Sequence, residues 1–437
     1  MIQTGLIQNA HSDLVTDASY DFYGLRLATC SLDQRIKIWQ LDEANGTWNV
    51  EDDWRAHDAA VSKVSWAHPE FGSIIASSSF DRTVKIWEQV SSAPQDPSQA
   101  SLNGSASGSG LSTSRWIECT SLLESRGTVR SVEFAPHHFG LKIATISSDN
   151  HLRIYECLES PNPFNWQLTT EVDVLSLPLS TTPASHSHTH TGALATPTQT
   201  TATLDAASAS LVSQALQQGL SQSAAPGATQ PGRSGMGSRE ADGGWCISWC
   251  KDRYWGEVIA AGCGISGTIK IVQLSPSHRP TTLLTLDPSP RAASATQNTQ
   301  GGEAAMETDT QPHVSHAITS VAWAPSCGRS YHLIATGGRD GRVRIWKVKP
   351  APEDDEAEGG RWTASVVADF EDHKSAVGRV EWNITGTVLS SAGNDGRIRL
   401  WKATSGSVWR TAGSIGIEQA QDDDRENKDS GDVDMRG

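Results

Sequence analysis

Short runs of alternating apolar and polar residues recur along this chain, and tight turns separate them. In the clearest copy, an apolar run over residues 74–79 leads through Phe80-Asp-Arg82 into the alternating run Thr83-Val-Lys-Ile-Trp87. A second alternating run, Val61-Ser-Lys-Val-Ser-Trp66, lies upstream. Alternation with a period of two is typical of strands that are buried on one face. The pattern therefore predicts a repeating unit of consecutive β-strands.

The unit can be followed along the chain by an Asp that stands six residues before an aromatic residue. A degenerate fourth copy, over residues 259–272, keeps the spacing but lacks both residues. Self-similarity of this kind is typical of a β-propeller of the WD-repeat class. We therefore expect an all-β fold, a six-bladed WD-repeat β-propeller over residues 1–415. The five regular copies are Asp33 to Trp39, Asp81 to Trp87, Asp149 to Tyr155, Asp340 to Trp346 and Asp395 to Trp401.

Segments of a different composition interrupt the repeats. They are rich in Ser, Thr, Ala, Gln, Pro and Gly and hold too few large apolar residues to offset the entropy of ordering. We expect these segments to be disordered, and the end of the chain to form an acidic, disordered tail. The predicted insertions cover about residues 92–114, 178–243, 289–311 and 350–360, and the tail covers 416–437.

Counting strands raises the question of how the ring closes. Each unit has a candidate outer strand of its own, including the last unit, which ends with Val408-Trp-Arg-Thr411. A closed ring of six blades is geometrically allowed. A ring sized for seven blades would instead leave a gap between the first and sixth blades, where unpaired strand edges invite strand addition by a partner. The strand count is compatible with both rings.

Composition limits the function classes. The formal net charge of −15 and the pI near 5.4 argue against a nucleic-acid footprint, which would need a basic face. Seven Cys without a recurring spacing suit a reducing compartment. The first residues do not resemble a signal peptide, and no apolar run reaches the ~18 residues of a membrane span. We expect a soluble cytosolic or nuclear protein.

The recurring polar residues are the first candidates for chemistry. A His, a Ser and an Asp in one unit could be read as a catalytic triad, but a catalytic site would not be repeated in several units. Buried polar groups must be paired, so we expect one structural hydrogen-bonded network in each blade instead. The expected network residues are His57, Ser77, Asp81, Trp87, His373, Ser391, Asp395 and Trp401, with Asp33, Trp39, Asp340 and Trp346 in two further blades.

Three weaker patterns have structural interpretations. The run Gly262-Cys-Gly-Ile-Ser-Gly267, with Asp287 twenty residues on, matches a dinucleotide-binding fingerprint, but an alternating run follows it where a helix is required. The cluster His186-Ser-His-Thr-His190 has no further ligands beside it for a metal ion. We therefore expect no cofactor, no metal site and no catalytic residue. The basic pairs Arg35 and Lys37, Arg342 and Arg344, and Arg397 and Arg399 are interpreted as solvated faces or as neighbours of Trp rings.

Several segments go beyond the general repeat. Asp13–Phe22, Trp66–Gly72, Phe80–Thr83 and Trp382–Leu389 together resemble the small WD-repeat nucleoporin of the Y-shaped nuclear pore coat, a relative of the WD-repeat subunit of the outer vesicle coat. The resemblance covers five of the six units, is weak in the fourth, and is absent from the insertions and the tail.

This resemblance implies a structural function at the nuclear pore complex of the nuclear envelope. Members of the family form an open six-bladed propeller, which an α-helical scaffold nucleoporin completes by inserting a seventh blade in trans. The implied partners are that nucleoporin and other subunits of the Y-shaped complex, which supports mRNA and protein transport. A second implied role lies in a coat-like complex at the vacuolar or lysosomal membrane that regulates amino-acid and TOR signalling. Partner contacts are expected on the exposed edges of the first and sixth blades.

A second function class stays open at the level of sequence. A WD-repeat adaptor of a ubiquitin ligase or chromatin complex would recruit peptides through its top face. Such an adaptor should be a closed ring with an exposed aromatic or Arg cluster at the central channel. A scaffold of the kind described above should be open between its first and sixth blades.

Overall fold

The computed structural model describes residues 7–91, 114–159, 162–178, 242–274, 279–288, 316–350, 362–404, 406 and 408–416. All of them belong to one compact unit, and a second unit at 183–237 lies outside the described residues. The predicted insertions and the acidic tail also lie outside the described residues, apart from a few residues at their ends. Among the described helices, none is long and apolar enough to cross a membrane.

The described residues form six antiparallel sheets of four strands, and each sheet uses four consecutive strands. We call these sheets blades 1 to 6. The expected all-β, six-bladed WD-repeat propeller is confirmed. Blade 1 consists of β1 (Val15–Tyr20), β2 (Arg26–Ser31), β3 (Arg35–Asp42) and β4 (Thr47–Arg55). Blade 2 consists of β5 (Val61–Trp66), β6 (Ile74–Ser79), β7 (Val84–Ser91) and β8 (Ser114–Leu122). Blade 3 consists of β9 (Val129–Phe134), β10 (Lys142–Ser147), β11 (His151–Cys157) and β12 (Trp166–Asp173). Blade 4 consists of β13 (Cys246–Trp249), β14 (Val258–Gly262), β15 (Ile269–Gln273) and β16 (Thr281–Leu286). Blade 5 consists of β17 (Ile318–Trp323), β18 (His332–Gly338), β19 (Val343–Lys349) and β20 (Thr363–Phe370). Blade 6 consists of β21 (Val377–Trp382), β22 (Val388–Gly393), β23 (Arg397–Ala403) and β24 (Trp409–Gly416).

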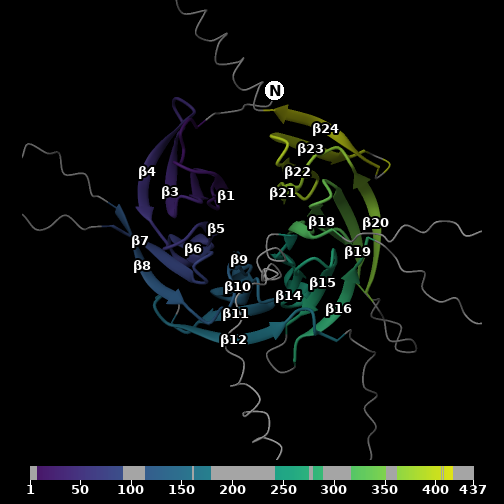
Figure 1. Ribbon diagram of the computed structural model, residues 1–437, viewed down its shortest axis with the longest axis horizontal. Coiled ribbons are helices and arrows are strands. Elements are labelled where there is room, and N and C mark those ends of the chain that lie inside the picture. The colour runs from purple at the N-terminus through teal and green to yellow at the C-terminus, as the bar shows by residue number, and fades with distance from the viewer. Residues whose placement is uncertain are drawn as a thin grey trace, which may run out of the picture. The chain divides into compact units, whose positions relative to one another are not determined.

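The sequence pattern explains why the strands stack radially. The second strand of blade 2, β6, is buried along its whole length, because small and aliphatic residues let sheets pack closely on both of its faces. The outer strand of blade 1, β4, alternates between exposed and half-buried residues instead. In Figure 1, β1, β5, β9 and β21 lie nearer the centre than β4, β8, β12 and β24, the fourth strands of the same blades. We call β1, β5, β9, β13, β17 and β21 the inner strands.

The apolar core is divided among the junctions between blades. One buried cluster joins blades 1 and 2, another joins blades 2 and 3, and further clusters join blades 3 and 4, 4 and 5, and 5 and 6. Within the described residues no apolar cluster joins blade 6 to blade 1. Figure 1 shows the same separation between the sheet of β21–β24 and the sheet of β1–β4.

The last blade needs no strand from elsewhere in the chain. Its four strands are consecutive, and β24 supplies the outer position. The inner strand β1 likewise pairs only with β2, in blade 1. The strand count expected from the sequence is therefore confirmed, and no sheet hydrogen bonds join the first and last blades in the described part of the chain.

Candidate functional site

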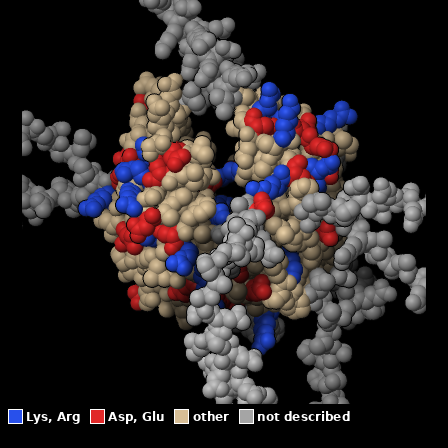
Figure 2. All heavy atoms as spheres, viewed as in Figure 1, with Lys and Arg blue, Asp and Glu red and all other residues tan. Residues whose placement is uncertain are grey.

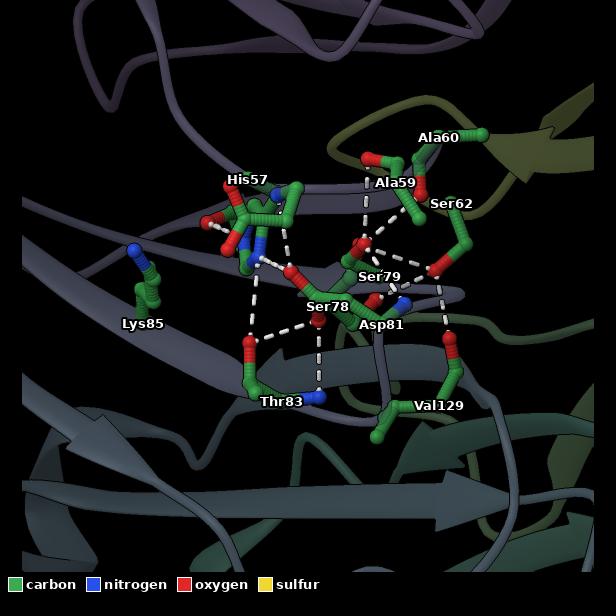
Figure 3. Close-up of polar contacts among 12 residues, drawn as sticks. His57, Ala59, Ala60, Ser62, Ser78, Ser79, Asp81, Thr83, Lys85 and Val129 are labelled. Carbon is green, nitrogen blue, oxygen red and sulfur yellow. Dashed lines mark hydrogen bonds and ion pairs between the residues drawn. The ribbon is translucent and has the colours of Figure 1, made fainter.

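In blade 2 the predicted polar residues lie within hydrogen-bonding distance of one another. His57 Nδ1 lies 2.9 Å from Asp81 Oδ2, and His57 Nε2 lies 2.7 Å from Ser77 Oγ. The indole Nε1 of Trp87 donates to the same Ser77 hydroxyl at 2.9 Å. Figure 3 shows how Thr83 joins His57 and Asp81 in this network. Because His57 and Ser77 are buried, the network ties β6, β7, the turn between them and the loop before β5 together inside the blade.

Blade 6 repeats this arrangement. His373 Nδ1 lies 3.1 Å from Asp395 Oδ1, and Ser391 Oγ lies 2.8 Å from both His373 Nε2 and the indole Nε1 of Trp401. Burial alone would raise the pKa of Asp395, but hydrogen bonds from His373 and Arg399 outweigh it and lower that pKa below its usual value. Asp395 is therefore held as a carboxylate.

Blade 1 contains a network residue that sequence reasoning missed. His11 Nδ1 lies 3.0 Å from Asp33, and His11 Nε2 lies 2.8 Å from Thr29, which also accepts from the indole of Trp39 at 2.9 Å. The spacing could have revealed it. His11 stands 22 residues before Asp33, and His373 stands 22 residues before Asp395 in blade 6.

The recurring Asp also builds the turn between the second and third strands. In each regular blade its carboxylate accepts the main-chain N–H of the residue two positions later, as Asp81 does from Thr83 at 2.9 Å. This local bond mimics a backbone turn. The residue between them adopts a left-handed conformation, with φ of 72° at Arg82 and 71° at Gly396. The repeated Asp thus has a structural reason that is independent of the His.

Two arginines differ from their expected place. Arg344 and Arg399 were expected on solvated faces or beside Trp rings, but both are buried and each pairs with the Asp of its own blade. That interpretation was wrong, because the side chain two residues before the aromatic residue points back over the turn carboxylate. Arg153 does the same in blade 3. The N–O distances are 2.8 Å for Arg153 and Asp149, 2.8 Å for Arg344 and Asp340, and 2.9 Å for Arg399 and Asp395.

The geometry of these networks serves stability rather than catalysis. The Ser77 and Ser391 hydroxyls are enclosed between an imidazole and an indole, and both are buried. A nucleophile needs access to a substrate and a nearby oxyanion site. Related sets in at least three blades satisfy buried polar groups instead.

The other sequence patterns yield no further site. Gly262–Gly267 forms the turn from β14 into β15, which is a strand, whereas a pyrophosphate site of this type requires a helix. His186–His190 lies outside the described residues. In the described part of the chain, no cluster of three His, Cys, Asp or Glu side chains could hold a metal ion. Figure 2 shows acidic and basic side chains mixed over the visible face rather than one continuous basic surface.

The clearest unusual feature is the side of blade 6 that points away from blade 5. In blade 5, the side chains on the equivalent side of the second and third strands pack on blade 6. This row of side chains includes Val343 and Ile345, which are both 0% exposed. In blade 6 the matching row is not covered, and Ile398 is 45% exposed. We call this row the open face of blade 6. It consists of Val388, Ser390, Ala392, Ile398 and Leu400, none of which is buried.

Blade 1 presents a matching open face toward the same gap. Tyr20, at the end of β1, contacts Trp48 with ring centroids 5.8 Å apart. The equivalent pair in blade 2, Trp66 and Trp116, packs against blade 1. Tyr20 is instead 58% exposed, and Val50 on the same side of the sheet is also exposed. The open face of blade 1 consists of Tyr20, Trp48 and Val50.

Among the described residues, a single ion pair reaches from one side of the gap to the other. The guanidinium of Arg379 on β21 contacts the carboxylate of Asp17 on β1. Asp17 also accepts the main-chain N–H of Val64 in blade 2, at 3.2 Å. This contact joins side chains at the inner end of the gap and leaves the two open faces uncovered.

Comparisons with known proteins identify the family. The model for the WD domain, G-beta repeat, matches residues 3–40, 48–88, 308–347 and 364–402. Nucleoporin SEH1 of Saccharomyces cerevisiae is 31% identical in an alignment that covers 94% of this chain and 99% of that protein. The chain belongs to the SEH1 family of WD-repeat nucleoporins. Human Nucleoporin SEH1 is 32% identical over 93% of this chain and 86% of that protein. The relative in Schizosaccharomyces pombe is 28% identical over 96% of this chain and 98% of that protein.

Membership of the SEH1 family confirms the resemblance seen in the sequence. As a nucleoporin, the chain is a structural component of the nuclear pore complex rather than an enzyme. The match spans nearly the whole chain, so it includes both blades that border the gap. We take the pair of open faces on blades 1 and 6 as the candidate functional site.

Proposed function

We propose that the chain is a scaffold propeller whose gap is filled in trans by a blade from an α-helical scaffold nucleoporin of the Y-shaped complex. The observation that carries this proposal is the uncovered row on blade 6. The same positions are covered in blade 5 by its neighbour, and Ile398 is exposed where Val343 is buried. A blade inserted between blades 6 and 1 would restore the missing junctions.

The energetic argument follows from the side chains on both faces. Burial of an exposed Ile or Leu is worth roughly 1.5–3 kcal/mol for the complete side chain, and Ile398 and Leu400 are only partly exposed at the start. An aromatic such as Tyr20 offers a larger apolar area. Added over two faces, these gains suit an obligate interface, which should exceed about 2,000 Å². The free chain should accordingly depend on its partner.

We also propose that the gap serves a coat-like complex at the vacuolar or lysosomal membrane that regulates amino-acid and TOR signalling. The support is the family resemblance together with the single gap between blades 1 and 6. One gap can hold only one blade, so the two complexes would compete for the same molecule. A competition assay with both scaffold partners should therefore show mutually exclusive binding.

The adaptor alternative finds less support. It requires a closed ring, whereas the open faces of blades 1 and 6 lack a common apolar core within the described residues. It also requires an exposed aromatic or Arg cluster at the channel. In the described residues, the channel-lining Arg130 lies over the ring of the buried Trp245, and Arg379 pairs with Asp17 and Glu381. The scaffold proposal explains the exposed row on blade 6, and the adaptor does not.

The test is a pulldown from nuclear-envelope extract, followed by co-expression with the captured scaffold nucleoporin. We expect Ile398→Arg to abolish co-purification, because it places a charge on the open face of blade 6. Val366→Arg on the outer strand β20 is the matched control, since Val366 is 43% exposed and Ile398 is 45% exposed. The control should bind like the unmodified chain. Equal binding by both variants would contradict the proposal.

A further inference from the structure

The inner strands are bonded to one another by a repeated contact. At each junction between successive blades, a side-chain oxygen on one inner strand accepts a main-chain N–H from the inner strand of the next blade. The contact occurs five times, at distances between 3.0 and 3.3 Å. The donor and acceptor pairs are Val64 and Asp17, Phe134 and Ser65, Trp249 and Glu133, Trp323 and Ser248, and Val380 and Ser320.

The geometry of an edge strand explains why this contact is needed. An inner strand pairs with only one neighbour, so every second N–H points away from its own sheet. In blade 1, the main-chain N–H of Asp21 donates to the carbonyl of Arg26 and so points toward β2. Because successive N–H groups of a strand point in opposite directions, those of Tyr20 and Ala18 point to the free edge. An unpaired main-chain donor away from water is costly. The acceptor on the preceding blade removes that cost at each junction.

The acceptors also follow a sequence rule. Each inner strand ends with an aromatic residue, and the acceptor stands one or three positions before it. Ser65, Glu133 and Ser248 stand one position before, and Asp17 and Ser320 stand three positions before. The final aromatic residues are Tyr20, Trp66, Phe134, Trp249, Trp323 and Trp382.

At three junctions the aromatic residue adds a second bond. The indole Nε1 of Trp66 donates to Ser19 O at 2.9 Å, and that of Trp249 donates to Glu133 O at 3.2 Å. Trp382 donates to Ala322 O at 3.0 Å. In each pair the accepting carbonyl belongs to the residue just before the final aromatic residue of the preceding blade. In blade 6 the corresponding carbonyl is that of Glu381.

The pattern stops on both sides of the gap. On blade 6, Glu381 precedes Trp382 by one position, and its side chain is 58% exposed with the Nε of Arg379 at 3.1 Å. On blade 1, no described side chain accepts the main-chain N–H of Ala18 or Tyr20. Within the described residues, the gap thus has an acceptor on one side and donors without a side-chain acceptor on the other.

We propose, resting on the proposed function, that Glu381 accepts a main-chain N–H from the inner strand of the inserted blade. That strand should end with an aromatic residue, preferably Trp, whose indole can reach the Glu381 carbonyl. It should carry Ser, Thr, Asp or Glu one or three positions earlier, to accept the N–H of Tyr20 or Ala18. The partner is therefore recognised by an inner strand of the same chemistry as the six strands of this chain.

The experiment measures the affinity of the full chain for the scaffold nucleoporin captured in the pulldown. We expect Glu381→Ala to weaken binding about tenfold, the size of one hydrogen bond to a charged group. Glu381→Gln keeps an acceptor oxygen, so its affinity for the partner should fall by less than about threefold. The control is Glu371→Ala, which removes an exposed carboxylate in the loop after β20 that pairs with Arg342, and this variant should bind normally. Because Glu381 is exposed, each free variant should melt like the unmodified chain.

Other outcomes separate this inference from the function on which it rests. Unchanged binding by Glu381→Ala, together with lost binding by Ile398→Arg, would overturn the inference and leave the proposed function standing. If Arg379→Ala and Glu381→Ala weaken binding equally, Glu381 only positions Arg379. That result would also overturn the inference. If Ile398→Arg binds normally, the proposed function itself fails.

The donor side of the gap has its own measurement. Hydrogen exchange of the free chain and of the complex should show slower exchange in β1 at Ala18 and Tyr20 after the partner binds. The outer strand β12 serves as a reference that should not change. Unchanged exchange in β1 within a formed complex would overturn the rule for the partner strand.

Discussion

At the scale of single residues, one carboxylate performs two tasks in each regular blade. Asp81 fixes its own turn by accepting the N–H of Thr83, and it holds His57 at 2.9 Å. Burial would raise the pKa of Asp81, but hydrogen bonds from His57 and Thr83 outweigh this effect and lower the pKa well below its ordinary value. The charged form is therefore favoured by folding.

The stability of the chain should reflect this shift. We expect Asp81→Asn to lower the free energy of unfolding by about 1.5–3 kcal/mol at pH 7, since it removes bonds to a charged group. A carboxylate whose pKa is lower in the folded chain than in the unfolded chain stabilises the fold at pH values above its unfolded pKa of about 4. This stabilisation is lost as the pH falls through the folded-state pKa. The difference between the two proteins in urea unfolding should thus shrink at acidic pH. Asp58→Asn, which removes an exposed carboxylate, is the control and should lower the free energy of unfolding only slightly.

At the scale of elements, the same kind of strand has different energetic importance in blades 5 and 6. Ile345 on β19 is fully buried by blade 6, whereas Ile398 on β23 faces the gap and is 45% exposed. Both side chains lie in the third strand of a blade and point toward the next position in the ring. The strand sequence is similar, and only the presence of a neighbour differs.

This contrast gives a matched pair of substitutions. Ile345→Ala should lower the free energy of unfolding by about 2–5 kcal/mol, because it removes buried methyl groups and leaves a cavity. Ile398→Ala should cost the free chain less than about 1 kcal/mol, and its larger effect should fall on partner binding instead. Chemical denaturation of both variants, with and without the partner, checks this. A large loss of stability in free Ile398→Ala would mean that the face is already covered.

The elements also show what the sequence could and could not predict. The spacing from Asp to an aromatic residue located five blades, because that spacing is a property of one hairpin and its turn. His11 was missed, and Arg344 and Arg399 were misplaced, because the network depends on side chains that converge only in three dimensions. The gap was left undecided because strand number is the same in a closed and an open ring. The two rings differ in whether the faces beside the gap are covered, which the exposure of residues such as Ile398 shows.

At the scale of the whole molecule, stability and assembly are linked. A partner that binds only the folded chain adds RT ln(1 + [L]/Kd) to its stability, which is about 2.7 kcal/mol at a concentration of 100 Kd. We expect the isolated chain to be poorly soluble and to melt at a higher temperature once the scaffold nucleoporin is present. Thermal denaturation with increasing partner concentration measures this. Good solubility alone, with an unchanged melting temperature after the partner is added, would contradict the expectation.

The five shared apolar clusters have a consequence for how the chain comes apart. In the part of the chain that the structure describes, blades 2 to 5 each share apolar clusters with two neighbours, whereas blades 1 and 6 each share one with a single neighbour. A row of units with nearest-neighbour coupling loses its terminal members first. Fraying should begin at β1–β4 and β21–β24 and proceed inward, as in a short linear array. A circular arrangement has no such starting points, so filling the gap would remove both of them at once.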